Sequence, residues 1–342
     1  DRVAMLLGNT YEDVVANYAA ARAGLVAVPL NPAYTSAEVA VLLADSGARV
    51  LLVQPATRTV GEESAAALPG CEVISVVGSE WSRIGRSGEG VVLPDDTTPE
   101  TLALLLFTAG TSGRPKGAML TNIEMLLSLS DPPAVVDADI VLVVLPMFHV
   151  YGLNTVLGLA MAVGATCVLV DRFDPVESLQ VIASEGVTTV AGAPGMYQAW
   201  CATPGLREAM STVRVLSSGG SPLPARVYTE FSALTGLEIF EGYGMTETAP
   251  VVATTLVSGA PKAGSVGRPL PGLEIRLVDE SGVEVDDGDP GEVWVRGPSV
   301  FLGYWPEAAG GPDAEGWFRS GDVAYADEDG DLHVVDRRRE VI

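Results

Sequence analysis

Cations are scarce in this chain of 342 residues. Lys and Arg together number 20 against 44 Asp and Glu, which gives a formal net charge of −24, and the only lysines are Lys116 and Lys262. So acidic a chain is not expected to bind nucleic acid or an anionic membrane. An anionic small molecule must instead be held by local donors, which makes a lysine among glycines informative.

Cysteines and long uninterrupted apolar runs are also lacking. Cys71, Cys167 and Cys201 are odd in number and far apart, which matches neither a disulfide set nor metal-ligand spacing. Residues 140–170 contain no Lys, Arg, Asp or Glu, but prolines and glycines divide them into pieces shorter than the roughly 20 residues of a membrane span. We therefore expect a cytoplasmic protein without a membrane span.

Two common nucleotide-binding motifs are absent. The chain has no G-x-x-x-x-G-K-[ST] phosphate loop. It also has no G-x-G-x-x-G after a strand-like run, which argues against a dinucleotide-dependent oxidoreductase. It begins at Asp1 without a methionine and shows no signal peptide, so we expect a fragment of a longer protein.

The segments that are present predict an α/β fold. Strand-like runs alternate with helical patterns through residues 1–259, which predicts mostly parallel sheets flanked by helices. Thr35 or Ser36 can cap one such helix, which Gly47 would end. Over residues 260–336, short strand-like segments lie between Gly-, Asp- and Pro-rich turns, which predicts a small antiparallel, β-barrel-like subdomain.

Residues 108–117 (TAGTSGRPKG) follow an apolar run that predicts a buried strand. Glycines let backbone amides approach an anion, hydroxyls donate further hydrogen bonds, and Pro115 stiffens the turn that presents the Lys116 ammonium. A Gly-rich surface turn would explain the glycines but not the scarce lysine. We predict a polyphosphate-binding loop that uses Thr108, Gly110, Thr111, Ser112, Gly113 and Lys116.

Two segments in the middle of the chain suit a flat base or an acyl chain. Residues 145–153 (LPMFHVYGL) follow a buried strand and contain one of the two histidines, His149. Residues 217–223 (SSGGSPL) carry two glycines that a ligand can approach closely, and Ser221 with Pro222 would start a helix.

Residues 241–250 (EGYGMTETAP) are the most specific segment. They follow a strand predicted at residues 237–240. Tyr243 can stack on a purine, Thr246 can bond a phosphate, and Glu247 can bind a hard cation such as Mg²⁺. An ordinary polar loop would explain neither the order nor the composition of these residues.

In this order, the segments resemble the motifs of the adenylate-forming enzymes. Residues 108–117 are similar to that family's [ST]-S-G-[ST]-[ST]-G-x-P-K-G loop, with Ala109 in place of a serine, and residues 145–153 are similar to its PxFHxxG motif. The family comprises acyl- and aryl-CoA synthetases, firefly luciferase and peptide-synthetase adenylation domains. The resemblance spans essentially the whole chain, is nearest to the fatty acyl-CoA synthetases (long-chain-fatty-acid–CoA ligases), and implies the family's large N-terminal domain.

The resemblance implies a role for each matching residue. Tyr243 contacts adenine, Asp322 holds the ribose hydroxyls beside Arg337, and Glu247 binds magnesium. The catalytic residues are Lys116, Thr246, which contacts the α-phosphate, and Glu247. Further ATP contacts come from the phosphate loop and from Gly219, Gly220, Ser221, Glu241 and Gly242. The acid is bound by His149, Tyr151, Gly220, Gly244, Met245 and Ala249.

The implied reaction activates a carboxylic acid with MgATP and transfers the acyl group from the acyl-adenylate to coenzyme A. A small, apolar acyl wall suits a medium- or long-chain fatty acid. An aryl-CoA (4-coumarate-like) ligase, an acyl-AMP-only ligase and a non-catalytic acyl- or nucleotide-binding module stay as alternatives. A carrier protein as thiol acceptor and the oligomeric state, a homodimer included, are left open.

The last residues resemble the start of a hinge. Residues 337–342 would lead to a small C-terminal domain that carries a further catalytic lysine, with Arg339 where the family commonly has Lys or Asp. We therefore expect this chain alone to bind ATP and acyl-adenylate but to turn over poorly. The SVGRP segment at residues 265–269 and His333 are interpreted as structural.

Overall fold

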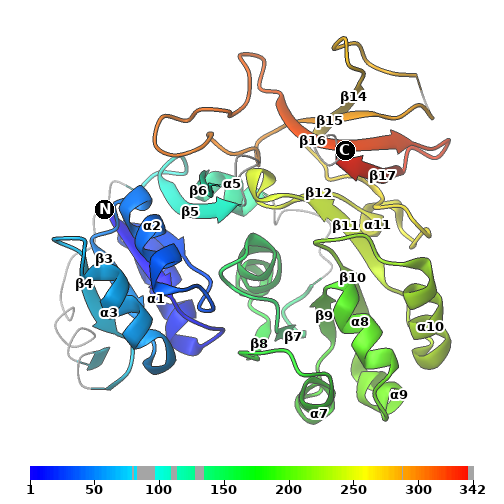
Figure 1. Ribbon diagram of the computed structural model, residues 1–342. Coiled ribbons are helices and arrows are strands. Elements are labelled where there is room, and N and C mark those ends of the chain that lie inside the picture. Colours follow the sequence, from blue (N-terminus) through cyan, green and yellow to red (C-terminus); the bar gives the residue numbers. More distant parts are fainter. Residues whose placement is uncertain (79–80, 83–96, 109–113, 128–134, 287, 338–342) are drawn as a thin grey trace. The chain divides into compact units, whose positions relative to one another are not determined.

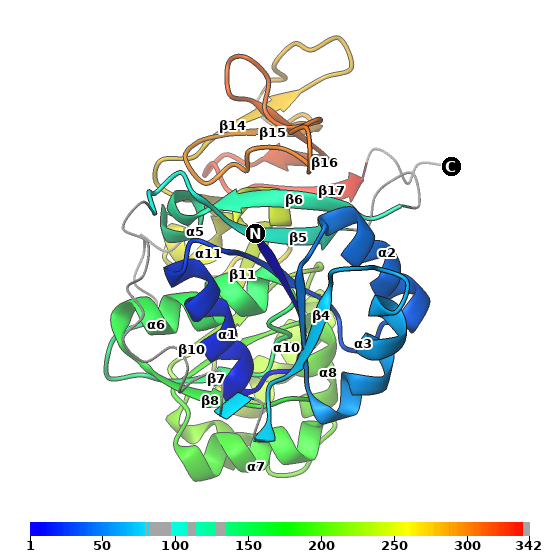
Figure 2. The same cartoon turned by 90° about the vertical axis from the view of Figure 1, so that its left-hand side faces the viewer.

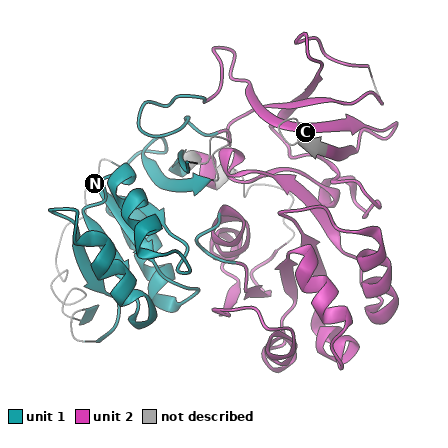
Figure 3. Cartoon of the chain, viewed as in Figure 1, with its two compact units in different colours: residues 1–123, 146–149, 301–310 teal, residues 124–145, 150–300, 311–342 magenta. Residues whose placement is uncertain are grey.

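The computed structural model describes the chain except for residues 79–80, 83–96, 109–113, 128–134, 287 and 338–342. Contacts divide it into two compact units (Figure 3). Unit 1 comprises Asp1–Ile123, Pro146–His149 and Phe301–Gly310, and unit 2 comprises Glu124–Leu145, Val150–Val300 and Gly311–Ile342. The functional boundary expected at residue 260 stays a prediction.

Unit 1 is built on a six-stranded sheet with the order β4-β3-β1-β2-β5-β6. The first five strands in that order run parallel and β6 is antiparallel to β5. The strands are β1 (Arg2–Leu6), β2 (Val26–Pro29), β3 (Val50–Val53), β4 (Glu72–Ser75), β5 (Leu102–Thr108) and β6 (Lys116–Thr121). The helical segments are α1 (Tyr11–Arg22), α2 (Ser36–Ser46), η1 (Pro55–Thr57) and α3 (Arg58–Ala65), with α2 and α3 side by side (Figure 2).

Local sequence explains where α2 begins and ends. The Thr35 hydroxyl accepts a hydrogen bond from the Glu38 amide while Glu38 returns one to Thr35, which is a capping box. Gly47 ends the helix at φ 62°, a conformation that glycine adopts without a Cβ clash. The predicted helix is therefore confirmed. Its buried face packs on Leu6, Val28 and Leu51 of the sheet, within one apolar core.

Unit 2 contains a seven-stranded sheet with the order β13-β12-β11-β10-β9-β7-β8. The five strands from β11 to β8 in that order are parallel, β12 is antiparallel to β11, and β13 is antiparallel to β12. They are β7 (Ile140–Val143), β8 (Thr166–Leu169), β9 (Thr189–Gly192), β10 (Val215–Ser218), β11 (Phe240–Gly244), β12 (Val251–Thr254) and β13 (Arg268–Pro269).

Helices connect these strands. They are a π-helix, η2 (Tyr151–Gly158), then α6 (Leu159–Val163), α7 (Pro175–Glu185), α8 (Pro194–Cys201), α9 (Leu206–Ala209), η3 (Met210–Thr212), α10 (Ala225–Thr235), η4 (Thr246–Thr248) and α11 (Thr255–Ser258). Another helix, α5 (Asn122–Leu127), lies where the chain passes from unit 1 to unit 2. Helices α8 and α10 lie side by side (Figure 1), and the Tyr197 ring packs edge-on against Trp200 and Phe231 between them.

Two local predictions in this unit are wrong. The helix expected to start at Ser221 and Pro222 starts at Ala225 instead, with Pro224 as its N-cap. The strand expected at residues 237–240 is β11, which begins at Phe240 and continues through the EGYG segment. Gly242 and Gly244 are typical of a loop, but β11 pairs with β12 here, and this pairing satisfies the backbone hydrogen-bonding groups of the segment.

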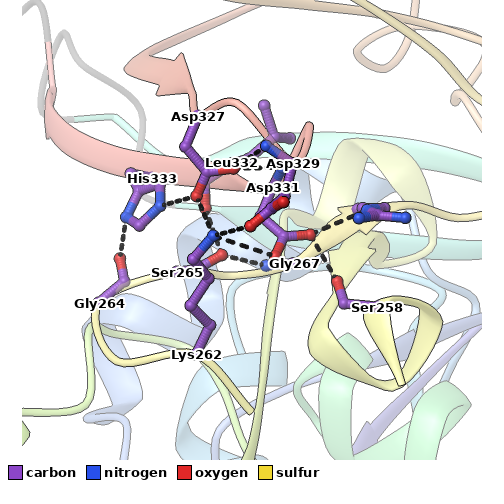
Figure 4. Close-up of polar contacts among 11 residues, drawn as sticks. Ser258, Lys262, Gly264, Ser265, Gly267, Asp327, Asp329, Asp331, Leu332 and His333 are labelled. Atoms are coloured by element: carbon purple, nitrogen blue, oxygen red, sulfur yellow. Dashed lines mark hydrogen bonds and ion pairs between the residues drawn. The ribbon is translucent and has the colours of Figure 1, made fainter. Parts of the chain in front are cut away.

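The predicted antiparallel subdomain is confirmed as a four-stranded sheet. It consists of β14 (Glu274–Val278), β15 (Gly291–Arg296), β16 (Phe318–Ala326) and β17 (Leu332–Arg337), each paired with the next. The SVGRP segment joins it to the rest of unit 2, because the Ser265 hydroxyl and the Gly267 carbonyl both bond the Leu332 backbone (Figure 4). None of the described helices has the length and apolar character that a bilayer crossing requires.

Candidate functional site

The parallel strands of unit 2 bring the motif segments to one edge of the sheet. Strands β7, β9, β10 and β11 are neighbours and run in the same direction, so their carboxyl ends share that edge. Tyr151 follows β7, Gly219 follows β10, and the turn η4 follows β11. The chain leaves β7 toward β8 on one side and reaches β9 on the other, which is the kind of switch point where open α/β sheets bind ligands.

The turn that follows β11 is closed by its own backbone and by one hydroxyl. The Met245 amide donates to the Pro250 carbonyl at 2.9 Å, and the buried Thr248 hydroxyl donates to the same oxygen at 2.6 Å. A Cβ at Gly244 would lie 1.9 Å from that carbonyl oxygen, so only glycine fits there. The turn therefore presents Thr246 and Glu247 from a fixed backbone.

Tyr243 and Asp322, predicted to bind adenine and ribose, lie together. The Tyr243 hydroxyl donates to Asp322 Oδ2 at 2.6 Å, and the Asp322 amide donates to the Ser320 hydroxyl at 3.0 Å. Asp322 is only 4% exposed. The bond joins β11 to β16, and it holds an aromatic ring next to a carboxylate, which is an arrangement suited to a nucleoside.

The predicted base and acid contacts also share the edge of the sheet. A Cβ at Gly219 would lie 3.1 Å from the Tyr151 ring, so that ring packs directly on the glycine. The Tyr151 oxygen lies 3.3 Å from the Ser217 hydroxyl, and burial raises the pKa of Tyr151 to about 12, which keeps the phenol neutral. Glu241 is partly buried, burial raises its pKa, and its carboxylate accepts from the Leu223 amide at 3.2 Å.

Unit 1 carries the predicted phosphate-binding lysine. Lys116 opens β6 in register with Thr108 of β5, and its ammonium lies 5.1 Å from the centre of the Tyr304 ring. Residues 302–305 reach that position by bonding the outer edge of β6, with the Trp305 amide donating to the Gly117 carbonyl at 2.8 Å. Arg114 is paired with Asp45 at 2.6 Å, so Lys116 is the loop cation that carries no carboxylate partner among the described residues.

His149 also belongs to unit 1. Its amide donates to the Pro146 carbonyl at 3.1 Å, and the neighbouring Met147 amide donates to Asn9 Oδ1 at 2.9 Å. Burial lowers the pKa of His149, which favours the neutral imidazole at pH 7. A neutral ring suits a contact with the substrate better than it suits charge neutralisation.

For several predicted site residues, the structure gives only a position in the fold or no description. Ala109, Gly110, Thr111, Ser112, Gly113 and Arg339 lie outside the described residues, and of Arg337 only the place in β17 is described. Gly220 and Ser221 are exposed in the turn after β10, Gly242 lies within β11, and Met245 precedes η4.

Residues that sequence reasoning missed include Ser217, Asn154 and Tyr304. Asn154 bonds the turn after β11, and Tyr304 faces Lys116. Ser217 opens the SSGGSPL segment, so the glycines of that segment are the local signal that marks it. Asn154 and Tyr304 act across long stretches of chain, and no local pattern marks them.

Comparisons with known proteins agree with this geometry. The sequence profile of the AMP-binding enzyme family matches residues 1–305. A feruloyl-CoA synthase of Amycolatopsis sp is 38% identical, with 100% of this chain and 69% of that protein covered. A long-chain-fatty-acid–CoA ligase of Escherichia coli O157:H7 is 30% identical, with 100% and 68% covered. The crystal structure of ATP-bound MatB from Rhodopseudomonas palustris superposes with a TM-score of 0.90 at 32% identity, with 100% and 69% covered.

The family match, the parallel sheets with their curled antiparallel sheet, and the ordered motifs therefore agree with one another. The ATP-bound neighbour has the same fold over the whole length of this chain. This chain thus belongs to the AMP-binding enzyme family, as an AMP-forming acid–CoA ligase.

Proposed function

We propose that this ligase activates an aromatic carboxylic acid. The acid's carboxylate oxygen attacks the α-phosphorus of ATP, and the bond from that phosphorus to pyrophosphate breaks. The thiol of coenzyme A then attacks the acyl carbon, AMP leaves, and the thiol proton passes to solvent. Both steps depend on holding the reacting groups in line and on neutralising charge on the phosphates.

The motif edge of unit 2 supplies the nucleotide contacts in this proposal. The Tyr243 ring packs on adenine, and Asp322 accepts hydrogen bonds from the ribose hydroxyls, with Arg337 beside it. A carboxylate has about four acceptor positions, so Asp322 can bind ribose while it keeps the bond from Tyr243. Thr246 donates to the α-phosphate. The adenine pocket is completed by Gly219, Gly220, Ser221, Glu241 and Gly242.

Two further groups act on the phosphates. Lys116 neutralises part of the charge on the departing pyrophosphate. Glu247 is half-buried on a fixed turn, and one such carboxylate fits Mg²⁺, which takes few protein ligands and fills its shell with phosphate oxygens and water. No group of three His, Cys, Asp or Glu side chains suited to a metal occurs in the described ranges, so the fit is to an ion that arrives with ATP.

The observation that supports an aromatic acid is the wall formed by Tyr151, Ser217 and Gly219. The Tyr151 ring packs against Gly219, where the missing Cβ leaves room for a ring, and the hydroxyls of Tyr151 and Ser217, 3.3 Å apart, give this wall a polar end. A ring with a polar substituent matches both features, whereas an alkyl chain would meet hydroxyls without bonding them. The 38% identity to a feruloyl-CoA synthase supports the same class.

A fatty acid, the substrate expected from the sequence, is the second candidate. The 30% identity to a long-chain-fatty-acid–CoA ligase supports it, and so does the half-buried, apolar Met245 beside the motif turn. Binding measurements separate the two candidates, because the affinity of a fatty acyl group should rise with each methylene that is buried.

The decisive experiment is calorimetric binding of non-hydrolysable acyl-adenylate analogues in the presence of Mg²⁺. The acyl groups are feruloyl, cinnamoyl, acetyl, dodecanoyl and hexadecanoyl. We expect the aromatic analogues to bind most tightly, and Tyr151→Phe to weaken the feruloyl analogue about fivefold while it leaves the cinnamoyl analogue, which has no ring hydroxyl, unchanged. Lys116→Ala and Glu247→Ala test the phosphate contacts.

Affinity that increases with aliphatic length, together with weak aromatic binding, would contradict the aromatic proposal in favour of a fatty acid. A folded protein that binds no analogue and no ATP would contradict adenylation itself and leave a non-catalytic module.

A further inference from the structure

The turn that carries Thr246 and Glu247 ends in a disfavoured backbone conformation. Ala249, which is fully buried, has φ 63° and ψ 36°, in the left-handed region where a Cβ crowds the following carbonyl. Few residues other than glycine and asparagine adopt it without support. Within the turn the Ala249 amide donates to the Thr246 carbonyl at 3.3 Å, and the Ala249 carbonyl is held by a group outside the turn.

Asn154 provides such a support. Its side-chain amide donates to the Ala249 carbonyl at 2.6 Å, which is short for a hydrogen bond of this kind, and also to the Met125 carbonyl at 3.1 Å. Asn154 is only 3% exposed. An asparagine has two donor hydrogens on one nitrogen, so it can bond two carbonyls at once, which a buried leucine or aspartate cannot do.

The position of Asn154 is itself constrained. It lies on the π-helix η2, and Gly158 on the same helix leaves room for it, because a Cβ at Gly158 would lie 2.8 Å from Asn154 Oδ1. The π-helix is a rare geometry that places side chains differently from an α-helix. Tyr151, which forms the wall proposed for the acid, is on this same element.

We infer that Asn154 is a positioning residue for the Thr246–Thr248 turn, where it holds the Ala249 carbonyl so that Glu247 and Thr246 face the nucleotide. This inference rests on the proposed function of those two residues. The helix η2 then has two roles, because Tyr151 lines the acid site and Asn154 fixes the turn that contacts the phosphates. Asn154 itself need not touch any substrate.

The test is the Mg²⁺ dependence of adenylate formation, measured by ATP–pyrophosphate exchange on the active enzyme. Asn154→Leu keeps the side-chain volume and removes both donors. We expect about a tenfold loss of rate at limiting Mg²⁺, a loss that becomes smaller at saturating Mg²⁺, and a KM for the carboxylic acid within about twofold of the wild type. Asn17→Leu is the matched control, because Asn17 is a buried asparagine in α1 that is 8% exposed. It should leave the Mg²⁺ dependence unchanged.

A second-site variant makes the test specific. Glycine adopts the left-handed conformation without a Cβ clash. The double variant Asn154→Leu with Ala249→Gly should therefore form adenylate about threefold faster than Asn154→Leu alone. If Asn154→Leu does not yield folded protein by circular dichroism, the double variant is compared with Ala249→Gly alone, and a raised Mg²⁺ requirement is still expected.

Glu247→Gln separates the inference from the proposed function. If Glu247→Gln leaves the Mg²⁺ requirement unchanged, the role proposed for Glu247 is wrong, whatever Asn154 does. If Glu247→Gln raises the requirement but Asn154→Leu behaves like Asn17→Leu, the positioning role is overturned. A loss in Asn154→Leu that is equal at all Mg²⁺ concentrations and not restored by Ala249→Gly also overturns it, because it would reflect general destabilisation.

Discussion

The chain's two lysines are placed in opposite surroundings. The Lys262 ammonium lies 2.7 Å from a carboxylate oxygen of Asp327 and 2.7 Å from one of Asp329 (Figure 4), and hydrogen bonds with both raise its pKa. The Lys116 ammonium instead lies 5.1 Å from the centre of the Tyr304 ring, and no ion pair within the described ranges includes it.

This difference teaches how so acidic a chain can still bind an anion. A lysine already neutralised by carboxylates has little charge to offer a phosphate, whereas a ring attracts an ammonium without neutralising it. Tyr304 therefore keeps Lys116 in place and still available. The same contrast, with and without a counter-charge, recurs among the buried carboxylates, where it determines how stability depends on pH.

The largest expected effect is on activity at Lys116. Lys116→Ala should lower the rate of adenylate formation about 10²- to 10³-fold, because a preorganised charge at the departing phosphates is removed, and should leave the melting temperature unchanged. Pyrophosphate exchange and thermal unfolding measure the two quantities. Arg114→Ala is the control, since Arg114 is exposed and already paired with Asp45, and should stay within about threefold of the wild-type rate. Equal losses of adenylate-formation rate in Lys116→Ala and Arg114→Ala would contradict the proposal that only Lys116 acts on the phosphates.

Asp13 is a buried carboxylate that has no ion pair with any of the described cations. It is 3% exposed, it accepts from the Asn17 amide at 3.0 Å, and burial raises its pKa to about 7. Its folded pKa lies above the unfolded value, so its contribution to stability is complete below about pH 4 and is lost as the pH rises through 7. Between pH 5 and pH 8 the wild type should lose about 3 kcal/mol relative to Asp13→Asn. Urea unfolding at both pH values measures the free energy of unfolding of the two proteins. Equal changes with pH in the wild type and in Asp13→Asn would contradict the prediction.

A buried carboxylate with a cation is found at Asp139. Burial raises its pKa, but hydrogen bonds from Arg214, Thr188 and the Val136 amide outweigh burial and lower the pKa to about 2. This contribution to stability is present above about pH 4 and is lost as the pH falls toward 2. Arg214→Met should destabilise the fold by about 3 kcal/mol at pH 7, because it leaves a buried charge unpaired, and by less at pH 3, where Asp139 then becomes protonated.

Urea unfolding at the two pH values tests the Arg214→Met prediction. The control is Arg58→Met, which breaks the exposed Arg58–Glu62 pair and should change stability by no more than about 0.5 kcal/mol. If both variants lowered the free energy of unfolding equally at pH 7, the buried pair would contribute no more to stability than the exposed pair.

Sequence reasoning succeeded where the signal was local. A hydroxyl, a glutamate three residues later and a glycine at the end defined α2, and the change from alternating elements to short strands located the antiparallel sheet. It failed at Ser221, because the segment SPLP offers two prolines that suit a helix start, and the structure uses the second. There the Leu223 amide bonds Glu241, a partner 18 residues away.

The candidate site divides in the same way. Tyr243, Thr246 and Glu247 were available from one motif, and the structure adds the Tyr243–Asp322 bond that joins two motifs. The bond from Asn154 to Ala249 spans 95 positions, and nothing in a single sequence marks which buried asparagine has such a partner. Contacts of this kind depend on the packed sheet, so they follow from the fold and not from local composition.

The smallest expected effect is at Lys262. Lys262→Met keeps the apolar stem but leaves the carboxylates of Asp327, Asp329 and Asp331 to repel one another across the β16–β17 turn. We expect a melting temperature lower by about 2–4 °C at low salt, little difference at 1 M salt, where exposed charges are screened, and a KM for ATP within about twofold of the wild type. Lys262→Arg, which keeps the charge, should recover most of the loss. A large loss of activity in Lys262→Met with an unchanged melting temperature would reverse the roles of the two lysines, because the charge would then be serving the reaction and not the fold.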